Sequence, residues 1–457
     1  MMLRPYFVAE SAAMASIPPG IVENGAECTP RTILSNPGFL KLELMRRGIR
    51  VEQDCLDPAA FAPQGSRAST GGLSAHARNM FGNATDVDLI LPEGTWVTAP
   101  LSNHFTHPSP YLLRRNDSGC WLHWDPPFGQ QAEVIPPVCV QVVPPAAFYT
   151  RTTSTGLPLA RLGTVHGSYL ALSPIAQCSF VGTDDQCHFC SLTTKATDEL
   201  VAVDDILEAI RIVRDTTKID MVYLSVGHLS GSDGGVRALE PYIRAIKKHF
   251  DILVAMDALP PEHNAWIDRT YAMGVDSLSY NLEIFDPWRF DQICPGPSRR
   301  IGRQRFLDAL EYAATVLPAG AVICHLIVGL ESPESTCNGI DALLTRKVMP
   351  VLPIFRPFRG RDMRETDEAI ELETQQIFDL YGYLYKKVRQ HKLPMSWVQN
   401  ISVVTTPAEG RFFVGAKRPG LLQRLVGGER RPSVMLSDWR RALRVKEVDD
   451  SLKSSGL

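Results

Sequence analysis

The chain has 457 residues, of which 44% are hydrophobic and 21% charged, and its formal net charge is −3. This length exceeds one ordinary core, so two or three domains are expected, in a composition typical of globular proteins. The charge disfavours nucleic acid as a partner, because phosphate binding depends on clustered Lys and Arg. No run of about 18 apolar residues occurs and no export signal is recognised, so a cytoplasmic protein without a membrane partner is expected.

The first 160 residues are rich in Pro and Gly and show little helical periodicity. Residues 86–100 and 132–145 have the pattern of short strands broken by turns. These features predict an N-terminal β-rich or irregular domain over residues 1–160. Its four cysteines stand far apart in the sequence, and each is expected to be a buried thiol.

The pattern changes near residue 165, where strand-like and helix-like segments begin to alternate. Strands are predicted over 168–174, 220–227, 251–257, 275–283, 321–331 and 349–358. Helices are predicted over 204–218, 236–250, 261–274, 303–317, 335–347 and 366–392. Six β/α units in series indicate an α/β fold in which a parallel sheet curves into a partial (β/α)6 TIM-type barrel over residues 165–392. A hairpin over 402–420 is expected within a C-terminal extension, residues 393–457.

Three cysteines follow the first strand of this predicted barrel: Cys178, Cys187 and Cys190. In parallel barrels the loops after the strands carry the active site, and three thiolates in one loop suit a soft metal centre. A zinc site would need a fourth ligand, for which His188 is available, and would make the chain a zinc-stabilised binding module without catalysis. A [4Fe–4S] cluster would instead have one iron without a protein ligand, which is an open coordination position in a catalytic site.

The cysteine loop resembles that of radical S-adenosylmethionine (SAM) enzymes, and within them the biotin-synthase-like branch. That family has Cys-x3-Cys-x2-Cys with an aromatic residue before the last cysteine; here the spacing is Cys-x8-Cys-x2-Cys and the aromatic residue is Phe189. The resemblance implies that the three cysteines bind a [4Fe–4S] cluster whose fourth iron chelates SAM. It implies reductive cleavage of SAM to a 5′-deoxyadenosyl radical, which abstracts hydrogen from a small-molecule substrate in cofactor maturation or natural-product biosynthesis. The electron would come from an external flavodoxin- or ferredoxin-type donor.

Further segments resemble the SAM-binding parts of this family over residues 165–360. Ser225 and Gly227 stand where the family has a glycine-rich strand end whose backbone receives the SAM amino group. Asn281 and Glu283 alternate to one side of the fourth strand, and the resemblance places their side chains near the ribose hydroxyls. The usual glutamate of the glycine-rich segment is absent.

Three more positions complete the implied SAM site. Arg299 matches the arginine that approaches the SAM carboxylate, a role that suits the fork of guanidinium donors. Ile327 and Gly329 match the fifth-strand segment that packs against adenine. Cys294, Cys324 and Cys337 form no evident set, so no auxiliary cluster is expected. The N-terminal region is expected to help cover the barrel mouth.

Overall fold

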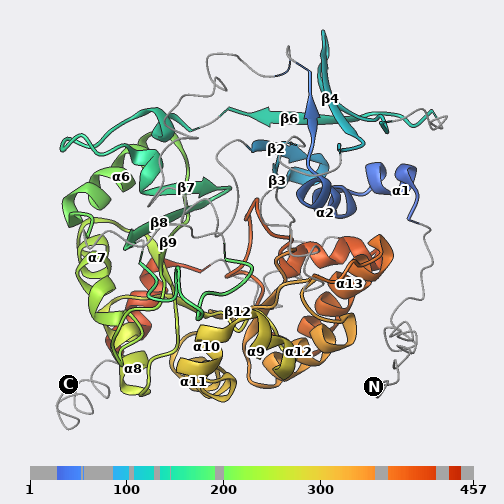
Figure 1. The fold of residues 1–457 in the computed structure, drawn as a ribbon. Helices are drawn as coiled ribbons and strands as arrows, with labels where there is room; N and C mark the ends of the chain where they lie inside the picture. The colour runs from blue at the N-terminus through green and yellow to red at the C-terminus, as the bar shows by residue number, and fades with distance from the viewer. Residues whose placement is uncertain are drawn as a thin grey trace, which may run out of the picture.

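The computed structural model contains two sheets, the larger of which curves into a partial barrel (Figure 1). The residues it describes are 28–52, 55, 86–101, 108–127, 134–144, 146–175, 177–190, 200–355, 369–417 and 432–443. The end of the sixth predicted strand and the start of the last predicted helix lie outside the described residues. Within the described ranges, no helix combines the length and the apolar character that a membrane span requires.

Six parallel strands form the larger sheet in chain order, and a seventh strand pairs antiparallel at one edge. The strands are β7 (Gly163–His166), β8 (Tyr169–Ile175), β9 (Met221–Val226), β10 (Leu253–Ala258), β11 (Ser277–Tyr280), β12 (Val322–His325) and β13 (Met349–Val351). Every residue of β8, β11 and β13 is buried, as in strands that are covered on both faces. The predicted α/β partial barrel is confirmed, with its six strands in the expected order.

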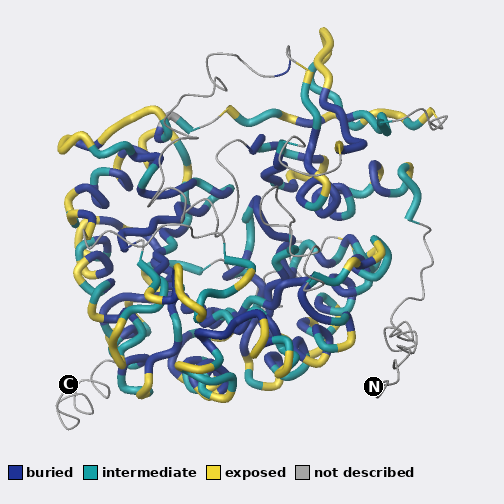
Figure 2. The backbone as a smooth tube through the Cα atoms, viewed as in Figure 1, coloured by how far each residue is buried: buried dark blue, intermediate teal, exposed yellow. Residues whose placement is uncertain are grey.

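Helices cover the outside of this barrel, and their exposed residues lie on the side away from the strands (Figure 2). The six predicted helices are α6 (Val203–Thr216), α7 (Val236–His249), α8 (Ala265–Met273), α11 (Arg303–Val316), α12 (Pro333–Thr345) and α13 (Thr374–Gln390). Two short helices between β11 and α11 are not predicted: α9 (Pro287–Ile293) and α10 (Pro295–Arg300). Each begins at a proline, because the fixed φ of proline suits the first helical position.

The N-terminal region forms a six-stranded sheet in the order β1-β4-β5-β6-β2-β3. Its strands are β1 (Arg50–Val51), β2 (Val87–Leu91), β3 (Thr95–Ala99), β4 (Tyr111–Asn116), β5 (Gly119–Trp124) and β6 (Val138–Val143). Two helices precede it, α1 (Pro30–Ser35) and α2 (Pro37–Arg47), and short 3-10 helices occur at η2 (Pro92–Gly94), η4 (Ala147–Thr150) and η5 (Leu159–Arg161). The strands expected near 86–100 and 132–145 are therefore present in the described residues.

Helix α2 escapes sequence analysis because two of its buried positions are charged. Lys41 is fully buried, and its ammonium group donates to both carboxylate oxygens of Glu409 at 2.9 and 2.8 Å and to the carbonyl of Ile401 at 2.8 Å. Glu43 is 2% exposed and pairs with Arg46 and Arg47. These ion pairs break the apolar periodicity by which an amphipathic helix is recognised.

Glu409 belongs to η7 (Pro407–Val414), a 3-10 helix in the region where a hairpin is expected. The predicted hairpin over 402–420 is therefore wrong in its described part. Thr406 and Glu409 form a capping box, with the Glu409 carboxylate accepting from the Thr406 backbone N–H at 2.7 Å. A capping box initiates a helical turn, and this local signal prevails over strand formation.

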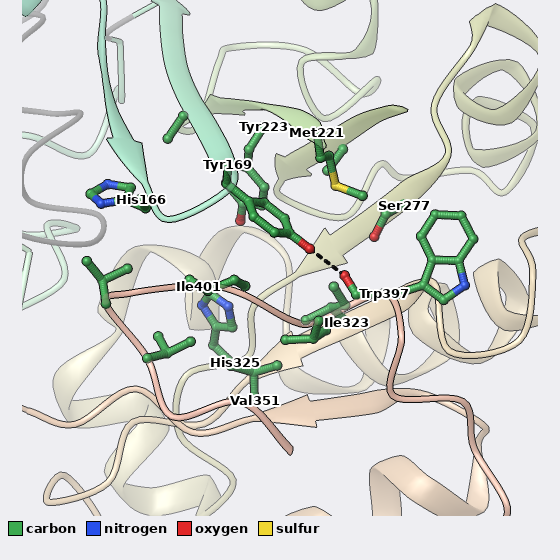
Figure 3. A pocket seen from close by; sticks show the side chains of 15 residues that line it. His166, Tyr169, Met221, Tyr223, Ser277, Ile323, His325, Val351, Trp397 and Ile401 are labelled. Carbon is green, nitrogen blue, oxygen red and sulfur yellow. Dashed lines mark hydrogen bonds between the residues drawn. The ribbon is translucent and has the colours of Figure 1, made fainter. Parts of the chain in front are cut away.

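The stretch just before η7 closes the amino-terminal end of the barrel. Tyr169, Met221 and Ser277 are the first residues of β8, β9 and β11, and they line a cavity of about 50 Å³ (Figure 3). The Tyr169 hydroxyl donates to the carbonyl of Trp397 at 2.7 Å, and Trp397 also lines the cavity. This end of the barrel is thus a closed, mainly apolar core.

A C-terminal helix over residues 434–443 is tied to the same end of the barrel through a buried carboxylate. Asp276, just before β11, is 0% exposed and accepts hydrogen bonds from the backbone N–H of Val254, the Ser437 hydroxyl and the Arg441 guanidinium. Lys247 on α7 also pairs with Asp276, at 3.3 Å. The network joins α7, β10, β11 and the C-terminal helix.

Candidate active site

The carboxyl ends of the barrel strands gather most of the predicted site residues. Cys178 lies three residues beyond β8, and Gly227 follows β9 directly. Glu283 lies three residues beyond β11, and Ile327 two residues beyond β12. Ser225 differs, because it lies within β9, is 3% exposed and forms a hydrogen bond with the Ser173 hydroxyl of β8 at 3.0 Å.

Close packing against the end of β9 holds the first part of the cysteine loop. A Cβ atom on Gly227 would lie 2.5 Å from both the Cβ of Cys178 and the carbonyl oxygen of Gln177. Next along the chain, the carbonyl of His228 accepts a hydrogen bond from the Ser179 backbone N–H at 2.8 Å. The His228 ring stacks on the Phe180 ring, with 4.2 Å between the ring centroids. Gly227 therefore serves the cysteine loop, since any larger residue would displace Cys178.

Contacts with the α9–α10 region hold the second part of the loop. The His188 backbone N–H donates to the carbonyl of Ile293 at 2.9 Å. A Cβ atom on Gly296 would lie 2.3 Å from the Asp185 carbonyl oxygen. The loop is thus packed between β9 on one side and the helices after β11 on the other.

Two arginines of α10 clamp an aspartate of the loop. Arg300 and Arg299 donate to the two carboxylate oxygens of Asp185 at 3.0 and 2.9 Å. Their hydrogen bonds hold the pKa of Asp185 below its usual value. Arg299 is the residue predicted to meet the SAM carboxylate; its side chain is 61% exposed, and in this structure it contacts the cysteine loop.

All three predicted cluster ligands are partly exposed cysteines that form no disulfide. Burial raises the pKa of Cys178, which is near enough to Cys187 for the two thiols to interact electrostatically. The Cys190 backbone N–H donates to the Cys187 carbonyl at 3.0 Å, a tight turn that brings these two residues together. No three His, Cys, Asp or Glu side chains of the described ranges converge on a single ion, as a mononuclear zinc site would require.

A fourth thiol lies beside this loop. Cys294, between α9 and α10, is 1% exposed and lies close enough to Cys187 for the two thiols to interact. It also interacts electrostatically with Cys190 and with Glu283. Sequence analysis misses it, because more than one hundred residues separate Cys294 from the loop and no spacing pattern connects them.

Two partly buried carboxyl groups, Glu283 and Asp257, lie at the barrel mouth, and Glu283 interacts with the Cys187 thiol. Burial, together with the neighbouring Asp257 and Cys187, raises the pKa of Glu283 well above its usual value. Burial also raises the pKa of Asp257 to about 7. The Asp257 carboxylate accepts a hydrogen bond from the Asn281 amide at 2.9 Å and interacts with Tyr223, whereas no described residue hydrogen-bonds to the Glu283 carboxylate. Glu283 is therefore the carboxyl group free to meet a ligand.

The side chain of Asn281 forms hydrogen bonds with residues of the barrel. Its amide donates to Asp257 at 2.9 Å, and its amide oxygen accepts from the Ser279 hydroxyl at 2.6 Å and from the His325 backbone N–H at 3.0 Å. These bonds connect β10, β11 and β12. Asn281 thus orients the carboxyl groups of the mouth, and its predicted contact with ribose stays a prediction.

Beyond β12 the chain forms a rim at the barrel mouth. Ile327 is 8% exposed, and its backbone N–H donates to the Glu283 carbonyl at 2.8 Å. Gly329 has φ of 100°, a conformation that favours glycine. Glu331 is buried and accepts from the backbone N–H groups of Phe285 and Asp286 at 2.9 and 2.8 Å. Glu331 therefore fixes the loop after Glu283, while Ile327 and Gly329 lie at the predicted adenine side.

Comparison with known sequences yields one curated relative, and no family model matches the chain. The relative is bacteriochlorophyllide c C-7(1)-hydroxylase of Chlorobaculum limnaeum, which is 24% identical over 137 residues. The match covers 29% of this chain and 34% of that protein, so the chain spans about a third of the relative's length.

Comparison with solved structures yields distant likenesses. Methylornithine synthase is 15% identical with a TM-score of 0.39, over 48% of this chain and 62% of that one. The FeFe-hydrogenase maturase HydG of Carboxydothermus hydrogenoformans is 14% identical with a TM-score of 0.39, over 48% and 51%. A radical SAM methyltransferase of Sphaerobacter thermophilus is 12% identical with a TM-score of 0.35, over 62% and 75%.

Proposed function

We propose that the chain is a radical SAM enzyme that acts on a small-molecule substrate at the carboxyl end of its barrel. One observation carries this proposal: three partly exposed thiols share one anchored loop, and one of them, Cys187, interacts with Glu283, whose carboxylate has no described hydrogen-bond partner. When bound to Cys178, Cys187 and Cys190, a [4Fe–4S] cluster supplies the electron that cleaves SAM reductively to a 5′-deoxyadenosyl radical.

The donor set of the loop suits such a cluster. Thiolates are the ligands that hold iron–sulfur clusters, and each binds a different iron, so they need not converge on one point. Packing against Gly227 and the His188–Ile293 hydrogen bond fix the two ends of the loop before any metal arrives. A ligand loop that is ordered in advance loses less conformational entropy on binding.

The barrel mouth also suits a cationic cofactor such as SAM. Glu283 and Asp257 interact with each other, and both pKa values are raised. A positive ligand nearby would favour the ionised form of Glu283, so that binding relieves the unfavourable burial of its carboxyl group. We assign Glu283 to the ribose hydroxyls, with Asn281 positioning it through Asp257.

The remaining SAM contacts are assigned by position. The exposed part of the Arg299 guanidinium is proposed to meet the SAM carboxylate while its other face holds Asp185. Gly227 and Ser225 form the strand end nearest Cys178, where the SAM amino group is proposed to lie. Ile327 and Gly329 are proposed to pack against adenine, because they form the rim beside Glu283.

The reacting bond is proposed to be a C–H bond of the substrate. The curated relative is named for hydroxylation at a carbon of bacteriochlorophyllide c. We extend to this chain only the replacement of hydrogen on an organic small molecule, with an external flavodoxin- or ferredoxin-type donor. We also propose a cytoplasmic location, because thiols that must bind a cluster stay reduced in a reducing compartment.

The proposal is tested by reconstituting the protein with iron and sulfide without oxygen, then adding a reductant and SAM. We expect a brown protein with about four irons per chain, since a cube carries four, and formation of 5′-deoxyadenosine. Cys187→Ala should abolish the product, whereas Cys337→Ala, a buried thiol of α12, should retain it. A colourless protein with one tightly bound zinc would instead select the non-catalytic zinc module.

A further inference from the structure

The environment of Cys294 is unlike that of the other buried cysteines. It occupies the junction of α9 and α10, where the Ile293 carbonyl accepts the His188 backbone N–H at 2.9 Å. The neighbouring Gly296 packs against the backbone of Asp185. Backbone contacts on both sides of Cys294 therefore fix it against the cysteine loop.

Its side chain lies beside two cysteines of that loop. Cys294 is 1% exposed and Cys187 is partly exposed, and the two thiols are close enough to interact electrostatically. The hydrogen bond between His188 and Ile293, the residues next to them in the sequence, holds the two cysteines near each other. A partly exposed thiol with a buried thiol behind it is the arrangement of an attacking and a resolving cysteine. Cys190 is the competing partner, because it follows Cys187 in a Cys-x-x-Cys turn and such pairs also form disulfides.

We propose that, in the metal-free chain, Cys187 and Cys294 form a reversible disulfide that locks the cysteine loop onto α10. With oxidised glutathione as oxidant, the Cys187 thiolate attacks one sulfur of glutathione disulfide and releases one glutathione thiolate. Cys294 then loses its proton and attacks the Cys187 sulfur, which releases a second glutathione. Two protein thiols are oxidised and one glutathione disulfide is reduced to two thiols.

The lock would control loading of the site. On the proposed function, Cys187 is a cluster ligand, so its disulfide withholds one of three thiolates until a thiol reductant restores it. Because a thiolate is required for iron binding, the oxidised chain should take up markedly less iron than the reduced chain. The disulfide itself depends only on the chain, and it is tested without any metal.

The experiment maps disulfides in metal-free protein treated with oxidised glutathione, alkylated and digested with trypsin. Residues 162–195 form one tryptic peptide with Cys178, Cys187 and Cys190, and residues 290–299 form another whose one cysteine is Cys294. We expect loss of the free 290–299 peptide and appearance of the two peptides joined, at their summed mass less two hydrogens. Dithiothreitol should reverse this shift.

Matched variants identify the disulfide partner of Cys294. Cys187→Ala should abolish the joined peptide, and Cys178→Ala, Cys190→Ala and Cys337→Ala should retain it. A 162–195 peptide that loses two hydrogens while 290–299 stays alkylated would show a Cys187–Cys190 bond and overturn the proposal. Retention of the joined peptide in Cys187→Ala, or full alkylation of all four cysteines, would overturn it as well.

Iron uptake then separates the lock from the proposed function. The oxidised wild type should bind little iron until dithiothreitol is added, whereas Cys294→Ala should load with or without it. Equal uptake by oxidised and reduced wild type, with the disulfide present, would contradict the control of loading. Absence of SAM cleavage in a fully loaded protein would contradict the proposed function and leave the disulfide standing.

Discussion

The two ends of the barrel differ in what fills them. At the amino-terminal end, Tyr169 and Trp397 line an apolar cavity, and the buried carboxylate of Asp276 is held by two cations and a backbone N–H. At the carboxyl end, the pKa values of the Glu283 and Asp257 carboxyl groups are raised, and Glu283 interacts with the Cys187 thiol. Asp276 thus has its partners within the chain, whereas no described residue hydrogen-bonds to the Glu283 carboxylate.

The two ends of one sheet therefore have different roles: the amino-terminal end contributes to stability, and the carboxyl end is the proposed binding site. Substitutions at the amino-terminal end should lower the free energy of unfolding and leave ligand binding intact. Substitutions at the carboxyl end should change binding and should raise the free energy of unfolding where they remove a poorly compensated carboxylate.

The largest loss of unfolding free energy is expected for Asp276→Ala. The change leaves a buried Arg441, the Ser437 hydroxyl and the Val254 N–H without their acceptor. Breaking a buried ion pair from one side costs about 3–5 kcal/mol of unfolding free energy. Chemical denaturation measures this loss, and iron content after reconstitution of the folded variant should be unchanged. The exposed pair Arg114–Glu52 gives the control, since Arg114→Ala should cost less than about 1 kcal/mol.

Glu283→Gln should weaken SAM binding and should not lower the free energy of unfolding. Loss of a charge-assisted hydrogen bond to the ligand is worth about 1.5–3 kcal/mol, so the Kd of SAM for the reconstituted protein should rise roughly tenfold to hundredfold. The metal-free variant should be at least as stable as the wild type, because a buried carboxyl group is removed. Calorimetric titration with SAM and denaturation of the metal-free protein measure the two effects. An unchanged Kd would remove Glu283 from the proposed site.

Asp257→Asn should alter the pH dependence of stability. The folded chain retains the Asp257 proton up to about pH 7, while the unfolded chain releases it near the ordinary pKa of 3.8. Wild-type stability should therefore fall as the pH rises between these values and level off above about 7. The variant lacks this slope and should be about 1–3 kcal/mol more stable than wild type at about pH 8, with no gain near pH 4. Denaturation series at several pH values test this, and parallel slopes in both proteins would contradict it.

Tyr169→Phe should have a smaller effect confined to the amino-terminal end. It removes the hydroxyl that donates to the Trp397 carbonyl at 2.7 Å and keeps the ring that lines the cavity. The expected loss is about 0.5–1.5 kcal/mol of unfolding free energy. SAM affinity of the reconstituted variant should match that of wild type, and a change of tenfold or more would mean that the two ends are coupled.

The smallest effect on stability is expected for Arg299→Gln and Arg300→Gln. Both arginines clamp Asp185 and both are more than half exposed, so each loss should be below about 1 kcal/mol. Only Arg299→Gln should raise the Kd of SAM, because only Arg299 is assigned to its carboxylate. Equal Kd values for the two variants would mean that Arg299 only holds the cysteine loop and does not bind SAM.

Much of the barrel could be predicted from sequence, because each buried strand and each amphipathic helix carries its own local periodicity. Helix α2 could not, since Lys41 is buried through Glu409, far along the chain, and Glu43 is buried although it is charged and pairs with Arg46. The hairpin expected over 402–420 fails because the capping box at Thr406 and Glu409 starts a helical turn instead.

The candidate site could be predicted from local patterns mainly in its cysteine loop. Cys178, Cys187 and Cys190 share one loop, and their place after a strand indicates the functional end of the barrel. Cys294 and Asp257 come to this end through the fold, and no local pattern connects them with the loop. The contact between Arg299 and Asp185 is likewise set by the packing of α10 against the cysteine loop.

The central claim is that the carboxyl end holds a cluster to which SAM binds. Electron paramagnetic resonance of the reduced, reconstituted protein, recorded with and without SAM, tests it most directly. We expect the spectrum to shift on addition of SAM in the wild type, and Glu283→Gln to require a higher SAM concentration for the same shift. A cluster spectrum that does not change at any SAM concentration would contradict the account.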